Sequence, residues 1–464
     1  MVNKTSSDKV KLKQKSRKRS LADVAHDEEP ETKQGKTQPE FVSISEVEFK
    51  FLLSDQETVI EGLEKFIGSA EAVIEGQECP DIVAGYCRSS QTCSELFTLI
   101  DPTGPKMKAN ELALVFRCLE LVLTRIQTNL LKFSSTGEAV VQKLLAGHMG
   151  QVYNCLQEQN KSKTIKAALR LLTSMVRLSD RAKKAVQSRL NFAHATFPPI
   201  FRRRNRKDPN DVRSCAVALT LSFLQDSDLS TISSLVQQRT FLQQVIGGLK
   251  YDRHDLVLET LATLLDKVVT LPGLTKTEKV KLFSEMVLKQ LCELYDWQGP
   301  TGWVPGGKKR KKDDEPRVIP EGFSEDQEAV ANVAHAFLLE VCCSHKHGLN
   351  FYDKSLGTGN RNYNQLLAHL VDWLVKKMDK PKIADLIIGI LCACPDLIKA
   401  TLTNLCPSLT PRWSDKWRQL MGWLIKFLSS LDYFKEDHIT VVSMATKFCL
   451  PPTNVAAILT QGLK

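Results

Sequence analysis

The chain has 464 residues, of which 42% are hydrophobic and 7% aromatic, and it carries a formal net charge of +10. A chain of this length is longer than one compact core usually accommodates, which predicts several domains or an elongated stack of small units. The excess of Lys and Arg favours a polyanionic partner such as nucleic acid. The apolar runs are too short to cross a bilayer and the amino terminus is basic, which argues against a membrane protein or a signal peptide and indicates the cytosol or nucleus.

Residues 1–40 are predicted to form a disordered basic tail, because a Lys- and Arg-rich run is followed by acidic residues and a Gly, Thr and Gln spacer. The candidate localisation signal within this run consists of Lys15, Arg17, Lys18 and Arg19. Two interpretations stay open. The tail is a solvated arm that aids solubility, or it is a nuclear or nucleolar signal that also contacts phosphate.

From residue 41 onward, short amphipathic patterns alternate with polar breaks, and no segment has the pattern of a strand. A Ser or Thr with a Glu or Gln three positions later can form a capping box, and we use this pattern to predict helix starts at four places. The pairs are Ser54 with Glu57, Ser135 with Glu138, Thr275 with Glu278, and Ser324 with Gln327. Asp208, Pro209 and Asp211 indicate another start, followed by a helix at 212–224.

Apolar residues at helical spacing predict further helices, which Pro and Gly residues separate. These helices are expected at 112–126, 165–176, 256–268, 280–294, 366–378, 383–394 and 417–428. A pair of such helices takes about forty residues, the unit length of armadillo and HEAT arrays. The expected fold is therefore all-α, an irregular armadillo/HEAT-like helical repeat solenoid, with a first part at 41–295 and a second part at 324–464.

Two loops within this array are basic. In the first, an apolar segment at 197–201 leads into five candidate RNA-binding cations, which are Arg202, Arg203, Arg204, Arg206 and Lys207. A guanidinium cluster suits phosphate because each group can donate two hydrogen bonds to it. A solvated loop that caps neighbouring helix ends carries equal weight as an interpretation.

The second loop, 296–323, is predicted to be flexible because of its length. Its candidate RNA-binding run consists of Lys308, Lys309, Arg310, Lys311 and Lys312. The same run fits a localisation signal. Trp297 and Trp303 precede it among Gly and Pro residues, and we expect them to cover an edge of the core.

Residues suited to catalysis or metal binding are sparse, so we expect a protein that is not an enzyme and needs no cofactor. A zinc site was considered at Cys342, Cys343, His345, His347, Cys392 and Cys394, but the spacing does not match paired Cys ligands. The thirteen cysteines are interpreted as reduced core thiols. His335 and His369 lie in apolar helices and are interpreted as core histidines.

Several segments resemble the amino-terminal region of the nucleolar pre-ribosomal-associated protein family. They are 168–180, Asn191-Phe192, 211–213, and above all VAHAFLLE at 333–340 leading to GLNFYD at 348–353. The resemblance covers roughly 41–464 and implies a helical scaffold of early large-subunit assembly in the nucleolus. It implies pre-ribosomal RNA and assembly factors, including a DEAD-box helicase, as partners, and no small-molecule substrate. Family members are several times longer, which indicates a fragment, a short isoform or a piece that pairs with something else.

The expected function is a non-enzymatic scaffold that binds pre-ribosomal RNA electrostatically and assembly proteins along its helix faces. The alternative is an armadillo-like peptide-binding adaptor in nuclear transport or signalling. Such an adaptor needs a ladder of Asn and Trp at equal helix positions, whereas Trp373, Trp413, Trp417 and Trp423 do not recur at repeat spacing. A metal-dependent enzyme is the third possibility, which elemental analysis would test.

Overall fold

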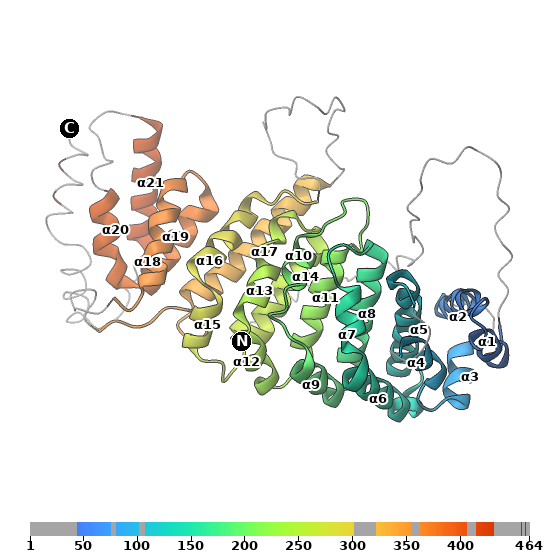
Figure 1. Ribbon diagram of the computed structural model, residues 1–464. Coiled ribbons are helices and arrows are strands. Elements are labelled where there is room, and N and C mark those ends of the chain that lie inside the picture. The colour runs from blue at the N-terminus through green and yellow to red at the C-terminus, as the bar shows by residue number, and fades with distance from the viewer. Residues whose placement is uncertain are drawn as a thin grey trace, which may run out of the picture.

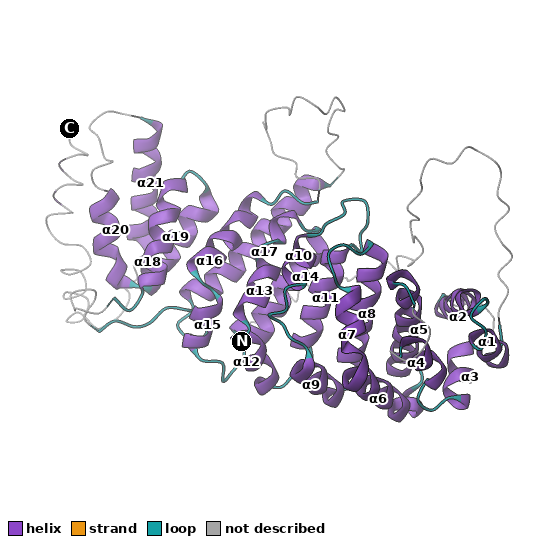
Figure 2. Cartoon of the chain, viewed as in Figure 1, coloured by secondary structure: helices purple, strands orange, loops and turns teal. Residues whose placement is uncertain are grey.

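The computed structural model describes residues 44–75, 80–101, 107–300, 322–354, 362–405 and 414–430, with isolated positions at 456 and 460. Within these ranges every regular element is a helix, as Figure 2 shows, so the all-α prediction is confirmed. The predicted tail at 1–40, Trp303 and the run Lys308–Lys312 lie outside the described residues. None of the helices in the described ranges combines the length and apolar character needed to span a membrane.

The helices of the first half of the chain are α1 (Glu46–Leu53), α2 (Val59–Ile74), α3 (Ile82–Ser89), α4 (Ser94–Ile100), α5 (Ala109–Thr128), α6 (Ser134–Lys143), α7 (Met149–Cys155), α8 (Ser162–Leu178), α9 (Asp180–Arg189), α10 (Phe197–Arg202) and α11 (Val212–Leu224). Those of the second half are α12 (Leu229–Gln237), α13 (Arg239–Ile246), α14 (His254–Leu264), α15 (Lys276–Leu282), α16 (Glu285–Cys292), α17 (Phe323–Cys343), α18 (Gln365–Leu374), α19 (Pro381–Ala393), α20 (Ile398–Leu405) and α21 (Asp415–Ser430). Short 3₁₀ or π turns extend several of them, including η3 (Leu249–Tyr251), η4 (Leu265–Val269) and η5 (Glu293–Asp296).

One ladder of helices runs through the middle of the stack, because α5, α8, α11, α14, α17 and α19 pack successively against one another. The intervening helices complete units such as α9 to α11 and α12 to α14, which stack side by side in Figure 1. Ladder helices α5, α8, α11 and α14 start at residues 109, 162, 212 and 254, which are 53, 50 and 42 residues apart. The unit is thus three helices and mostly longer than the expected forty-residue pair.

The ladder helices supply much of a continuous apolar core. Phe116 of α5, Leu169 of α8, Phe223 of α11 and Leu261 of α14 are all fully buried within it. A single amphipathic helix cannot cover its apolar face alone, so each unit depends on its neighbours for stability. The confirmed architecture is therefore a helical solenoid held together by contacts between neighbouring units.

Most predicted helices occur, but their starts are less well predicted. The box of Thr275 and Glu278 is confirmed, because the Thr275 hydroxyl accepts a hydrogen bond from the Glu278 amide (3.3 Å) and Glu278 accepts one from the Thr275 amide (2.9 Å). The helix at 212–224 is confirmed, and its N-cap is Asp211. The segment 280–294 is broken after Leu282 and gives two helices, α15 and α16.

The other three capping boxes are wrong. Ser54 ends α1, where its hydroxyl donates to carbonyl oxygens of the preceding turn, and α2 begins only at Val59. Ser135 and Ser324 lie one residue inside α6 and α17, too late to act as N-caps. A four-residue motif also arises by chance, and its side chains can bind elsewhere in the folded chain.

Candidate nucleic-acid interface at the N-terminal ends of α11, α14 and α17

A buried ion pair joins the starts of two ladder helices. Arg213, in the first turn of α11, donates from Nε to both carboxylate oxygens of Asp252 (2.7 and 2.9 Å) and from Nη2 to one of them (2.7 Å). The two side chains are 1% and 4% exposed. A guanidinium and a carboxylate so far from water must satisfy one another, so this pair fixes the starts of α11 and α14.

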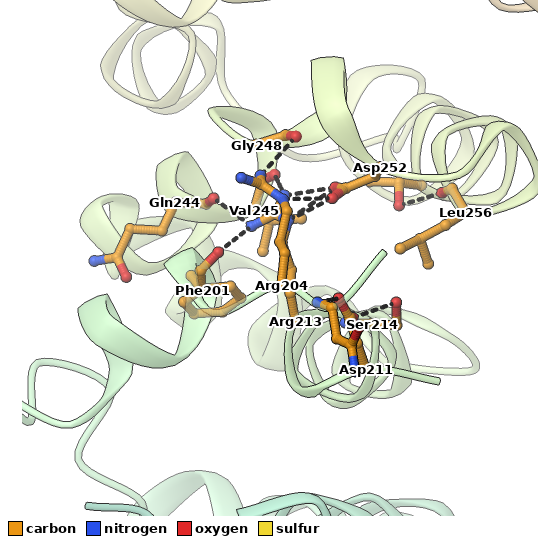
Figure 3. Close-up of polar contacts among 12 residues, drawn as sticks. Phe201, Arg204, Asp211, Arg213, Ser214, Gln244, Val245, Gly248, Asp252 and Leu256 are labelled. Atoms are coloured by element: carbon orange, nitrogen blue, oxygen red, sulfur yellow. Dashed lines mark hydrogen bonds and ion pairs between the residues drawn. The ribbon is translucent and has the colours of Figure 1, made fainter. Parts of the chain in front are cut away.

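The remaining donors of Arg213 bind main-chain oxygens of neighbouring helices. Nη1 donates to Phe201 (3.0 Å) and Gln244 (3.3 Å), and Nη2 donates to Val245 (2.7 Å), as Figure 3 shows. These carbonyls lie at the ends of α10 and α13, where helical partners are missing. One side chain therefore binds three carbonyls at two helix ends, which explains why a cation is buried in an otherwise apolar helix.

Arg204, in the first basic loop, joins the same carboxylate. Its Nε donates to Asp252 (3.2 Å) and its Nη2 to the Gly248 carbonyl (2.9 Å). A side chain at Gly248 would not fit, because a Cβ there would lie 2.2 Å from Cζ of Arg213 and 2.4 Å from Nη2 of Arg204. Gly248 thus lets two guanidinium groups reach one carboxylate.

The loop between α10 and α11 is pinned at both ends. The Asp211 carboxylate caps α11 by accepting from the Ser214 amide (2.8 Å), and its other oxygen accepts from the Asn205 amide (2.8 Å). Asp208 pairs with Lys166 of α8 (2.6 Å). The loop is consequently held against α8 and α11, and its exposed cations occupy defined positions.

The five predicted cations of this loop have different environments. Arg203 donates to the carbonyls of Glu158 (3.0 Å) and Asn160 (2.8 Å), and Arg204 is held by Asp252. Arg202 is not in a loop as predicted, because Phe197–Arg202 form the helix α10; it is exposed and donates to the Pro198 carbonyl (3.2 Å). The side chains of Arg206 and Lys207 are exposed and form no hydrogen bond or ion pair with any residue the structure describes. Arg202, Arg206 and Lys207 are therefore the members available to a ligand.

The first residues of the second basic loop reach the same place. Trp297 is 2% exposed, stacks on Phe323 (5.3 Å between ring centroids) and donates from Nε1 to the Asp252 carbonyl (3.0 Å). The Gln298 amide donates to the Lys250 carbonyl (3.1 Å). Trp297 thus lies within the core, in agreement with the expectation that it covers an edge of the core, and Gln298 lies next to Lys250.

Sequence reasoning missed the residues that bring these loops together. Arg213 and Asp252 are 39 positions apart, and nothing local links them. One signal was present, because Arg213 is the sole charged residue of 212–224 and an isolated charge in an apolar helix needs a partner. We define the Asp252 hub as Arg204, Arg213, Gly248, Asp252 and Trp297.

The histidines of the second half differ in their surroundings, and Cys392 is exposed, so the prediction of a core thiol is wrong for that residue. His335 is half-buried with Nδ1 3.0 Å from the Tyr295 hydroxyl, and burial lowers the pKa of its ring. His369 is not a core residue, because it is exposed and pairs with Glu285 (3.4 Å) on the outer face of α16 and α18. Within the described ranges, no three His, Cys, Asp or Glu side chains gather where they could hold a metal ion.

Comparison with known proteins gives a family match over most of the chain. The Npa1 family, described as "Ribosome 60S biogenesis N-terminal", matches residues 93–420, a range that contains the Asp252 hub. Nucleolar pre-ribosomal-associated protein 1 of Homo sapiens is 33% identical over 372 residues, and that of Mus musculus is 32% identical over 372 residues. Each alignment covers 80% of this chain but 16% of the relative, so the chain spans about a sixth of their length. No solved structure matches the chain.

Proposed function

The chain belongs to the Npa1 family of ribosome 60S biogenesis proteins, and we propose that it is a non-enzymatic scaffold that binds pre-ribosomal RNA and assembly factors during large-subunit assembly in the nucleolus. The names of the human and mouse relatives support the nucleolar and pre-ribosomal part of this proposal. The solenoid supports the scaffold part, since such stacks offer long surfaces on which several partners bind at once.

The Asp252 hub is the structural observation that best supports the proposal of RNA binding. It fixes Arg202 at the end of α10, and the following loop with Arg206 and Lys207, beside the first described residues of the second loop. Two segments that are far apart in sequence are thereby held next to each other. Phosphate groups along one RNA strand would be bound at several points, and each contact would release a counterion.

The proposed scaffold acts by positioning its partners and makes or breaks no covalent bond. A scaffold that holds RNA and assembly proteins on one rigid body raises their effective concentration for one another. The proposed protein partners, among them a DEAD-box helicase, would occupy helix faces away from the basic loops. This division of surfaces keeps protein contacts and phosphate contacts from competing.

Salt-dependent binding of pre-ribosomal RNA fragments to the purified chain tests the proposal. A first variant reverses the available cations, with Arg202→Glu, Arg206→Glu and Lys207→Glu. A second replaces all five cations at 308–312 by Ser. Arg203 and Arg204 are left unchanged, because their bonds to carbonyls and to Asp252 hold the fold.

A matched control places the same charge change on α9, with Arg181→Glu, Lys184→Glu and Arg189→Glu. These residues are exposed, and α9 contacts the opposite end of α11 through the bonds of Lys183 to the Gln225 carbonyl. The first variant should reduce the slope of log K against log salt by about 2, since each lost phosphate contact removes roughly 0.7. Wild-type affinity and slope in both loop variants would contradict the proposal.

The adaptor alternative receives less support from the positions of the tryptophans. Trp297 and Trp423 are 2% and 5% exposed and pack within the core. An extended peptide needs such rings on an accessible face. Among the described residues, these two rings are therefore not presented as the adaptor requires.

A further inference from the structure

An exposed aromatic ring lies between the two basic loops. Tyr251, the last residue of η3, is 42% exposed. Arg204 of the first loop has its Cζ 5.6 Å from the ring centroid. The carbonyl of the neighbouring residue, Lys250, accepts a hydrogen bond from the Gln298 amide at the beginning of the second loop.

The backbone that carries this ring is held on both sides. The Gly248 carbonyl accepts from the Tyr251 amide (3.1 Å) and from Arg204 (2.9 Å). The next residue, Asp252, is fixed by Arg213 and by Trp297. Tyr251 therefore presents its ring from a rigid support, which limits the side-chain entropy lost when a ligand binds.

Cations surround the exposed ring. The Lys250 ammonium lies 5.9 Å from its centroid, and the Arg204 guanidinium is held in place by Asp252. Single exposed aromatic residues are common on protein surfaces and need no explanation. An exposed aromatic ring with the cations Arg204 and Lys250 beside it has the composition of a site for single-stranded nucleic acid.

We propose that Tyr251 is a stacking platform for an unpaired RNA base, so that the Asp252 hub selects single-stranded RNA over duplex RNA. This inference rests on the proposed function and adds the substrate class. Lys250 and the exposed cations of the first basic loop, Arg206 and Lys207, would bind phosphates next to one nucleotide while its base stacks on the ring. A duplex buries its base faces in its own stack, so it offers phosphates to the loops but nothing to Tyr251.

Binding of two RNA probes to the whole chain separates these contributions. The probes are a single-stranded uridine-rich 12-mer and a hairpin duplex of similar charge. Tyr251→Leu should weaken binding of the single strand about tenfold, as expected for the loss of one base stack, and leave the hairpin unchanged. Tyr251→Phe should bind both as the wild type does. Tyr352→Leu is the matched control, because Tyr352 is 74% exposed and outside the hub.

A second measurement does not depend on variants. Ultraviolet cross-linking of the 12-mer carrying 5-iodouridine, followed by mass spectrometry, should identify Tyr251 as a linked residue. Unchanged single-strand affinity in Tyr251→Leu, or cross-links that omit Tyr251, would overturn the stacking platform. If the loop charge variants still weaken binding of both probes, the proposed function stands without it. If the wild type binds neither probe, both the stacking platform and the proposed RNA-binding function are contradicted.

Discussion

Arg213 and Asp252 are 39 residues apart, yet three hydrogen bonds of 2.7 to 2.9 Å join them, with both side chains almost fully buried. Removing one partner of such a pair leaves an uncompensated buried charge. We expect Asp252→Asn to lower the free energy of unfolding by roughly 3–5 kcal/mol. Urea denaturation measures the loss.

Asp255→Asn is the control for that substitution. Asp255 pairs with Arg253, but its side chain is 56% exposed, and solvent-exposed pairs contribute little. The two variants change the same functional group three residues apart. Equal denaturation midpoints for them would show that the buried pair does not stabilise the stack.

Gly248→Ala tests the crowding of the hub from the backbone side. The added Cβ would lie 2.2 Å from Cζ of Arg213, so the buried guanidinium must move away from its partners. We expect a loss of roughly 1–3 kcal/mol in the free energy of unfolding. Gly150→Ala, in α7, meets nothing within 4 Å, and should raise it by roughly 0.4–1 kcal/mol. Thermal unfolding of the two variants should therefore shift in opposite directions.

The fold was largely predictable because the helical spacing of apolar residues is visible within each segment. The pattern at 212–224 gave the bounds of α11. Helix starts were less predictable, because capping residues also bind distant groups. Glu138, read as part of a capping box, instead accepts from Arg181 of α9 (3.2 Å), and Gln327 donates to the Trp297 carbonyl (2.9 Å). Such contacts exist only once the units are stacked.

The candidate site was predictable only in part. A run of arginines marked the loop before α11, but sequence does not distinguish Arg206, whose side chain forms no hydrogen bond or ion pair with the described residues, from Arg204, which Asp252 holds. That difference depends on which carbonyls and carboxylates the folded chain brings near. The link from Asp252 to Trp297 joins loops 45 residues apart and had no local signal.

Lys183 and Lys184 are adjacent and differ in burial, which makes them a matched pair. Lys183 donates to the carbonyls of Gln225 (2.6 Å) and Asp226 (3.1 Å), where the chain leaves α11 with Asp226 at φ +49°. We expect Lys183→Met to lower the free energy of unfolding by roughly 1–3 kcal/mol, because the two carbonyls lose the donor of their partly buried hydrogen bonds. Lys184, exposed and paired with Asp228, should change little on the same substitution. Similar losses in urea denaturation would contradict this assignment.

The cysteines should differ sharply in reactivity. Burial raises the pKa of the thiols of Cys155 and Cys292 to about 12, and both lie in the core. Cys392 is exposed. In a background where Cys79, Cys406 and Cys449 are Ser, Ellman's reagent at pH 8 should label Cys392 first, because attack requires an accessible thiolate. Cys392→Ser should abolish the fast phase, and a fast phase that persists would show that the core thiols are accessible.

Acid should weaken the first units of the stack through Glu95. Its carboxylate accepts from the hydroxyls of Ser90 (2.7 Å) and Tyr86 (3.1 Å) and pairs with Lys50 (3.0 Å). Burial alone would raise the pKa of Glu95, but these bonds together lower it to about 2. Between that value and the ordinary 4.5, the unfolded chain binds more protons than the folded chain does. The stabilisation is therefore complete above pH 4.5 and is lost as the pH falls towards 2.

Glu95→Gln should remove this dependence, because an amide does not titrate in the window. Urea midpoints measured from pH 6 to pH 3 should fall more steeply for the wild type than for Glu95→Gln, and the two curves should converge as the pH falls. Glu61→Gln is the control, since Glu61 forms a pair with Lys65 on the surface of α2 and should keep the wild-type slope. Parallel curves for the wild type and Glu95→Gln would mean that the bonds to Glu95 do not favour its charged form.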